Sequence, residues 1–74
     1  MVYCAECGYE DICLNMVGRL MREFDMRLEA IEIVAAAGGQ LEISVGDELI
    51  HSTLITGRFP RADEVIAAVR ERVP

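Results

Sequence analysis

The chain has 74 residues, which suits one compact domain and is too short for two, so we expect residues 1–74 to form a single domain. Apolar residues make up 53% of it, which excludes a disordered chain. Thirteen acidic residues against seven scattered arginines give a net charge of −6, which disfavours binding to nucleic acid or to anionic lipid.

The sequence shows no membrane-spanning or export signal, and this bears on the cellular compartment we expect for the protein. No apolar run approaches the roughly 20 residues needed to span a bilayer. The start of the chain, residues 1–4, lacks the charged and apolar regions of a signal peptide. We therefore expect a cytoplasmic protein, in which three cysteines indicate catalytic or metal-binding thiols rather than a disulfide framework.

The first half of the chain predicts a short strand followed by a helix. Val2 and Tyr3 are β-formers directly before the first cysteine. Residues 9–24 have helical periodicity, with Glu10 and Asp11 in the first turn, where negative charge suits the helix dipole. The predicted apolar stripe consists of Cys13, Val17, Leu20 and Phe24, flanked by Met16 and Met21.

Three further strands are predicted after this helix. Residues 28–34 indicate a strand with imperfect alternation, and Gly38–Gly39 marks a turn. Residues 41–45 alternate between apolar and polar types, as a half-buried strand does. Gly46–Asp47 then predicts a tight turn, with residues 48–55 as the partner strand of a hairpin.

The facing of His51 depends on the hairpin register. Loops of two and of three residues put His51 on opposite faces, so the sequence leaves its side open. A lone histidine without a partner carries little catalytic signal, and we expect His51 to be a strand residue that packs near the sheet surface.

The last helix follows an irregular segment, residues 56–60. Its predicted apolar stripe is Ala62, Val65, Ile66, Val69 and Val73. The order is then β-α-β-β-β-α. A right-handed crossover makes the first two strands parallel and the hairpin adds antiparallel ones. We expect an α/β two-layer sandwich with a four-stranded mixed sheet and both helices on one face.

The motif that carries chemistry is Cys4-Ala5-Glu6-Cys7. Two residues of spacing let the thiols close a small disulfide ring, and a helix N-terminus stabilises a thiolate. Cys7 lies nearer the predicted helix start, so we assign it as the attacking thiol and Cys4 as the resolving one, although the order can be reversed. Glu6 and the acidic first turn of the helix oppose thiolate formation.

Two other readings of the cysteines stay open. Cys4 and Cys7 are also suited to a soft metal such as copper(I). A zinc site would add Cys13 and His51, although Cys13 falls in the apolar stripe, where free cysteine behaves as a small hydrophobe. A third reading is an interaction module that binds through the uncovered face of the sheet, without catalysis.

The segment around Arg58 and Phe59 has a structural and a functional interpretation. In the first, Gly57 makes a turn, Phe59 packs the chain onto the last helix, and Pro60 starts that helix. In the second, this loop lies beside Cys4 and Cys7 and contacts a partner.

Several of these segments together resemble one family. Residues 3–9 (Tyr-Cys-Ala-Glu-Cys-Gly-Tyr), Gly38–Gly39, residues 48–52 and residues 56–60 are similar, in order and spacing, to the SelW-like Rdx proteins. These are the cysteine-containing relatives of selenoprotein W, and the similarity covers essentially the whole chain. Fewer residues precede Cys4 than is usual there.

The resemblance implies a thioredoxin-like fold and a role in cell redox homeostasis. It implies glutathione as a thiol partner. We also expect protein thiols or disulfides as partners, and no bound cofactor or metal. Selenoprotein members carry selenocysteine at the position of Cys7, which agrees with the assignment above. Gly8 and Tyr9, together with Arg58 and Phe59, are the residues we expect to contact a partner.

Overall fold

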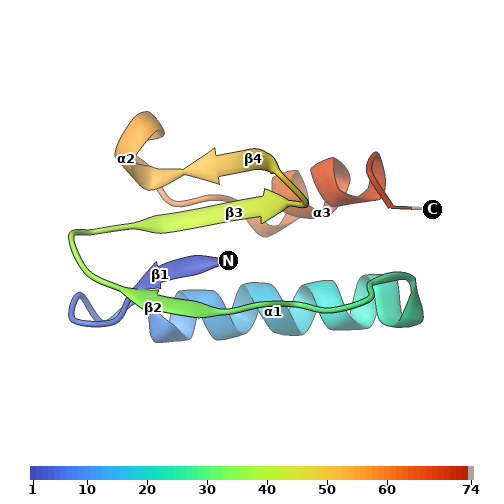
Figure 1. Ribbon diagram of the computed structural model, residues 1–74, viewed down its shortest axis with the longest axis horizontal. Coiled ribbons are helices and arrows are strands. Elements are labelled where there is room, and N and C mark those ends of the chain that lie inside the picture. The colour runs from blue at the N-terminus through green and yellow to red at the C-terminus, as the bar shows by residue number, and fades with distance from the viewer. Residues whose placement is uncertain (74) are drawn as a thin grey trace.

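The structure is a computed structural model that describes residues 1–73. Figure 1 shows the order of its elements. They are β1 (Val2–Cys4), α1 (Glu10–Phe24), the 3₁₀ helix η1 (Asp25–Arg27), β2 (Val34–Ala36), β3 (Leu41–Val45), β4 (Glu48–Ser52), α2 (Thr53–Thr56) and α3 (Ala62–Arg70).

The four strands form one mixed sheet in the order β2-β1-β3-β4. β1 runs parallel to β2, with Val2 opposite Val34, and antiparallel to β3, with Tyr3 opposite Leu41. β3 and β4 form the antiparallel hairpin. The crossover from β1 through α1 to β2 is the parallel connection that the sequence predicts, so the fold is the expected thioredoxin-like α/β arrangement.

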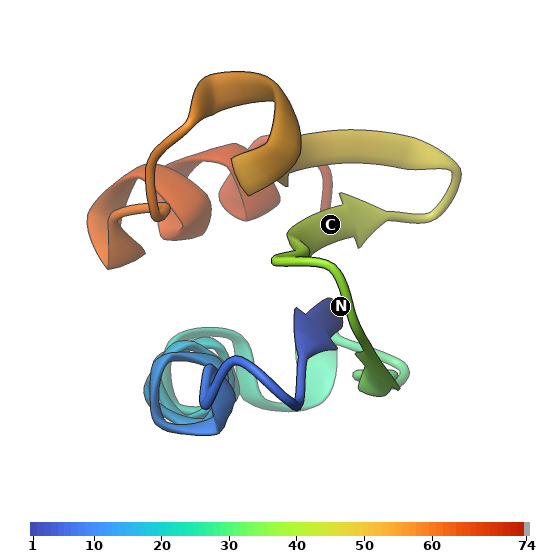
Figure 2. The same ribbon diagram turned by 90° about the vertical axis from the view of Figure 1, so that its left-hand side faces the viewer.

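Both long helices cover the same face of the sheet. In Figure 2, α1 and α3 lie on one side and the strands on the other, and this two-layer arrangement confirms the prediction. The core between the layers is apolar and draws on both helices and β3. Its buried members are Met16, Leu20, Phe24, Ile43, Val65, Ile66 and Val69.

α1 confirms the predicted helix almost to the residue. All four stripe residues are buried, and Met16 joins them, whereas Met21 is 59% exposed. The helix ends at Phe24 because Asp25 takes a left-handed backbone conformation, with φ of 51°. α3 likewise buries the centre of its predicted stripe, and Ala62 packs at the core margin. Val73 packs there too, although the helix ends before it, at Arg70.

The predicted strand over residues 28–34 is wrong in position. β2 spans only Val34–Ala36, because its partner β1 offers three residues and the ladder therefore holds three pairs. The apolar residues before it have another use, since Leu28 and Ile31 pack against the core without strand pairing. The imperfect alternation of apolar and polar residues in this segment therefore reflects core packing by an irregular segment and not a strand.

The hairpin has a two-residue loop and a bulge. Val45 pairs with Glu48 across Gly46–Asp47, whereas further along Ile43 pairs with His51, so β4 carries one extra residue. The bulge places His51 opposite the core residue Ile43, and His51 is 8% exposed. This settles the side that the sequence left open.

The predicted second strand of the hairpin is too long at its end. β4 stops at Ser52, and the next four residues form α2 instead of continuing to Ile55. The hydroxyl of Thr53 explains the change, because it accepts the Leu41 N–H at 3.0 Å and takes the place of a backbone partner there. A side-chain hydrogen bond thus ends the ladder.

Within residues 1–73, no helix combines the length and the apolar character needed to cross a bilayer.

Candidate functional site

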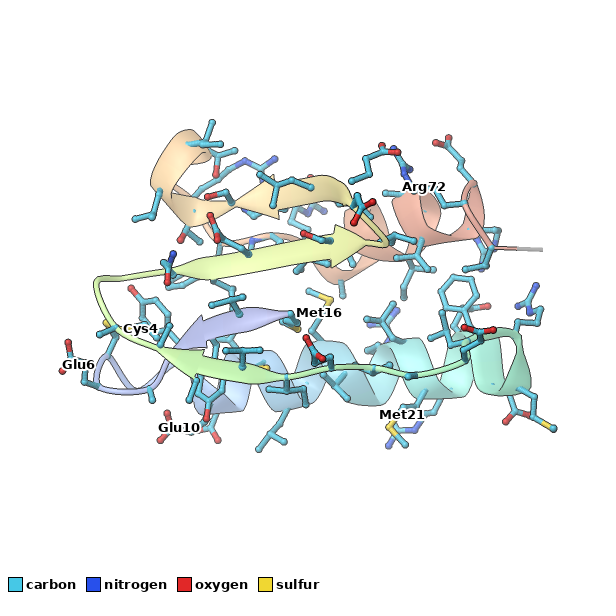
Figure 3. All side chains as sticks on the ribbon, viewed as in Figure 1. Cys4, Glu6, Glu10, Met16, Met21 and Arg72 are labelled. Carbon is cyan, nitrogen blue, oxygen red and sulfur yellow. A yellow bond between two sulfur atoms is a disulfide. The ribbon has the colours of Figure 1, made fainter. Side chains whose placement is uncertain are left out.

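Cys4 and Cys7 are joined as a disulfide at the end of β1. Their Cα atoms lie 5.3 Å apart. Cys4 is fully buried and Cys7 is exposed, so only one of the two residues faces a partner. Figure 3 shows Cys4 at the end of the sheet where the chain turns towards α1.

The backbone of the motif is fixed by three hydrogen bonds. The Ala5 N–H donates to the Ala36 carbonyl at 2.9 Å, which ties the motif to β2. The Gly8 N–H donates to Ala5 at 3.2 Å and the Tyr9 N–H to Cys4 at 3.3 Å. Gly8 has φ of 77°, a conformation that favours glycine, so this residue closes the turn.

Opposing charges surround the disulfide. α1 begins at Glu10, three residues after Cys7, and its first N–H groups present partial positive charge that favours a thiolate. Glu6, between the cysteines, and Glu10 and Asp11 carry negative charge at the same end, as Figure 3 shows for Glu6 and Glu10. These carboxylates disfavour a thiolate, as expected from the sequence.

A second loop comes to the same end of the molecule. Figure 1 shows the β1–α1 turn, the β2–β3 connection and α2 there together. The Tyr9 and Phe59 rings stack edge to face, with centroids 5.0 Å apart and planes at 84°. The loop that follows α2 therefore lies against the residue that follows Cys7-Gly8, although sequence separates the two by 50 residues.

A groove of about 220 Å³ runs between these segments. It is lined by Tyr9, Gly39, Thr53, Gly57, Arg58 and Phe59. The structure thus brings together three of the residues expected to contact a partner, while Gly8 lies next to the groove through the chain and does not line it.

Arg58 supplies the one charged side chain of the groove lining. Its guanidinium pairs with the Glu64 carboxylate at 3.0 Å and donates to the Phe59 carbonyl at 3.2 Å. Phe59 itself is 45% exposed, so it does not pack the chain onto α3 as the structural interpretation supposed; the buried residue of that turn is Pro60.

Thr53 is a site residue that sequence reasoning missed. It lines the groove, and its hydroxyl donates to the Gly39 carbonyl at 2.9 Å. In the sequence, Thr53 was one hydroxyl residue within the predicted strand of residues 48–55, and such a residue is too common to point to a site.

Cys13 behaves as the sequence predicts. It is 2% exposed on α1, and its sulfur lies 3.7 Å from the Met1 sulfur. Burial raises the pKa of the Cys13 thiol above its ordinary value of 9.0, and the positive N-terminus opposes this shift in part. The thiol is therefore an unreactive core group.

The residues of the four-ligand zinc hypothesis do not come together. Among residues 1–73, no three His, Cys, Asp or Glu side chains are grouped as metal ligands. Cys13 and His51 are each engaged elsewhere, the first with Met1 and the second with the Arg58 carbonyl.

Comparison with known protein families gives a match over nearly the whole chain. Residues 1–71 match the Rdx family. The chain belongs to the Rdx family. The selenoprotein W-like, redox character of this family supports a redox role and thiol partners for the chain, and it agrees with the disulfide between Cys4 and Cys7.

Curated relatives agree with the Rdx assignment. The chain is 31% identical over 70 residues to "Migration and invasion enhancer 1" from Bos taurus and, equally, from Mus musculus. Each alignment covers 92% of this chain and 57% of the relative, so the chain spans a little over half the length of these proteins.

Proposed function

We propose that this Rdx protein is a thiol–disulfide oxidoreductase that works through Cys4 and Cys7 in cell redox homeostasis. Its partners are glutathione or protein thiols and disulfides, and it works in the cytoplasm as a single domain of residues 1–74. One observation carries the proposal: a buried and an exposed cysteine form a disulfide at a strand-to-helix turn.

The exchange begins at the exposed sulfur. The Cys7 thiolate attacks one sulfur of a partner disulfide, a Cys7–partner bond forms, and the other partner sulfur leaves as a thiolate that takes up a proton. Cys4 then loses its proton and attacks the Cys7 sulfur, which releases the second partner thiol. The protein dithiol is oxidised by two electrons and the partner disulfide is reduced to two thiols.

Burial supports this division of roles. The fully buried Cys4 is shielded from outside sulfur and reaches only a group already bound to Cys7. An intramolecular attack of this kind needs no further partner, so the mixed disulfide is short-lived in the natural protein.

The partner lies against the groove beside the disulfide. We assign Tyr9, Arg58 and Phe59 as residues that contact it, with Gly8 giving the turn its shape. Phe59 offers exposed ring surface, Tyr9 is half-buried beside it, and Arg58 offers hydrogen-bond donors.

The test is to trap the intermediate. The Cys4→Ser variant, mixed with oxidised glutathione, should accumulate glutathione on Cys7, seen as an adduct in intact-protein mass spectra. Cys7→Ser is the matched control, because its two remaining thiols, Cys4 and Cys13, are both buried and should stay unmodified. Equal adducts on both variants, or none on either, would contradict the proposal.

A further inference from the structure

The two sides of the groove are each held by one polar side chain, one from the end of β4 and one from the first residue of α2. His51 holds the side that contains Arg58 and Phe59, and Thr53 holds the side that contains Gly39. Neither residue belongs to the disulfide motif, and neither is explained by the exchange steps above.

His51 fixes the backbone that leads into Phe59. Its Nε2 lies 3.0 Å from the Arg58 carbonyl oxygen. Because a carbonyl oxygen only accepts, Nε2 carries the hydrogen in this contact. Thr56 adds to the hold, since its hydroxyl oxygen accepts the Arg58 N–H at 3.3 Å and lies 3.3 Å from the same Nε2.

Thr53 fixes the opposite side through a double contact. Its hydroxyl accepts the Leu41 N–H at 3.0 Å and donates to the Gly39 carbonyl at 2.9 Å. These two hydrogen bonds lie at the β3 end of the connection between β2 and β3, where Gly38 and Gly39 both have left-handed backbone, with φ of 85° and 80°. The Thr53 hydroxyl therefore fixes the loop beside two glycines, the residue type with the greatest backbone freedom.

The Phe59 ring lies at the surface and makes one aromatic contact. It is 45% exposed and packs edge-on against Tyr9. Without the hydrogen bond from His51, the position of this ring relative to Tyr9 would rest on the aromatic contact, on the buried Pro60 and on two solvent-exposed groups of hydrogen bonds. These are the bonds between the Thr56 hydroxyl and the Arg58 backbone, and the bond from the Arg58 guanidinium to the Phe59 carbonyl. The bulge in β4 brings the His51 side chain inward to make its hydrogen bond to the Arg58 carbonyl.

We propose that His51 and Thr53 are positioning residues of the redox site, which keep the groove open for the peptide part of a disulfide partner. This inference rests on the proposed function. The partner class is a cysteine-containing peptide, of which glutathione is the smallest convenient probe. A disulfide without a peptide backbone reacts at Cys7 without using the groove.

The test compares two oxidants on the reduced protein. Oxidised glutathione carries a peptide and hydroxyethyl disulfide does not. In His51→Leu and Thr53→Val, second-order rate constants with oxidised glutathione should fall roughly threefold to tenfold, as expected for the loss of one hydrogen bond. Rates with hydroxyethyl disulfide should stay within about twofold of the natural protein.

Conservative variants supply the rescue. His51→Gln keeps a side-chain N–H donor and Thr53→Ser keeps the hydroxyl, so both should recover most of the glutathione rate. Leu49→Ala is the matched control on β4, because Leu49 is exposed and does not line the groove. If His51→Leu fails to fold, the Thr53 pair carries the comparison alone.

A second readout does not depend on exchange. In the natural protein, nuclear Overhauser effects should connect the Tyr9 and Phe59 rings, and His51→Leu should weaken them. Equal slowing with both oxidants, or unchanged rates together with unchanged ring contacts, would overturn the positioning role. A natural protein that keeps the ring contacts but exchanges with neither oxidant would instead refute the proposed function, and the positioning role with it.

Discussion

The two ends of the molecule are held by different forces. At one end, which we call the site end, lie the Cys4–Cys7 turn, residues 37–40, α2 and the Arg58–Phe59 loop, connected by hydrogen bonds and one ring contact. At the other, the packed end, Phe24 is 1% exposed in the apolar core. Figure 3 shows the two ends, with Cys4 and Glu6 at the site end and Arg72 at the packed end.

Charged groups at the packed end lie around the core. The guanidinium groups of Arg27 and Arg70 lie 5.2 and 5.9 Å from the centre of the Phe24 ring. Arg70 also pairs with Glu23 at 2.8 Å, which links α3 to α1. Stability should therefore depend mostly on the packed end and chemistry on the site end, so that substitutions separate the two properties.

The largest effect should come from the exposed cysteine. Cys7→Ser removes the attacking sulfur, so exchange with any disulfide should fall to the level of the buried thiols alone, a loss of at least about 1,000-fold. Stopped-flow exchange kinetics measure the change. Retention of a substantial rate in Cys7→Ser would reverse the roles of Cys4 and Cys7.

A large stability effect should come from the core. Phe24→Ala should lower the free energy of unfolding by about 3–5 kcal/mol through lost burial and the cavity left behind. Met21→Ala, on the exposed side of the same helix, is the control and should change it by less than about 0.5 kcal/mol. Urea unfolding followed by circular dichroism distinguishes the two, and similar losses would contradict the assignment of the core.

A moderate effect should follow from the buried thiol at alkaline pH. Unfolded Cys13 ionises near its ordinary pKa of 9.0, whereas burial raises the pKa in the folded protein. The folded state then binds more protons, so stability is complete below about pH 9 and falls as pH rises above it.

The measurement uses the double variant Cys4→Ser, Cys7→Ser, which avoids disulfide exchange at high pH. Its urea midpoint should fall between pH 8 and pH 10 by more than that of the same protein with Cys13→Ala added. Equal falls in the two proteins would show that Cys13 is not buried as described.

The smallest effect on stability should come from the surface pair of Arg72 and Glu48. The hydrogen bond from Arg72 lowers the pKa of the Glu48 carboxyl. The stabilisation of the folded state by this pair is present above the ordinary pKa of Glu48. It is lost as pH falls through the lowered pKa that Glu48 has in the folded protein. Because both groups are solvated, Glu48→Gln should shift the urea midpoint only slightly, and added salt should reduce the difference further. A large, salt-independent shift would count against this view.

The packed end was largely predictable from sequence because its pattern is local. The stripe in α1 repeats at helical spacing, and every residue of it is buried. The displaced β2 marks the limit, since the three-residue length of β1 restricts its pairing and no pattern within residues 28–34 reports that length. Tertiary context overrode a local signal there.

At the site end, the motif was predictable and its support was not. Cys4 and Cys7 lie within four consecutive residues at a strand-to-helix turn. The hydrogen bonds of Thr53 and His51 join residues 14 and 7 positions apart and depend on the bulge between β3 and β4. Periodicity does not encode a bulge, so neither the facing of His51 nor the role of Thr53 followed from the sequence.

The central claim is that Cys4 and Cys7 form the redox pair and that Cys13 does not take part. A glutathione redox series, followed by alkylation of free thiols and intact mass measurement under denaturing conditions, tests it directly. We expect Cys4 and Cys7 to oxidise together, or Cys7 to take up glutathione, within the physiological range of potentials while Cys13 stays reduced. Thiols that remain reduced across the whole series, or oxidation that begins at Cys13, would contradict the account.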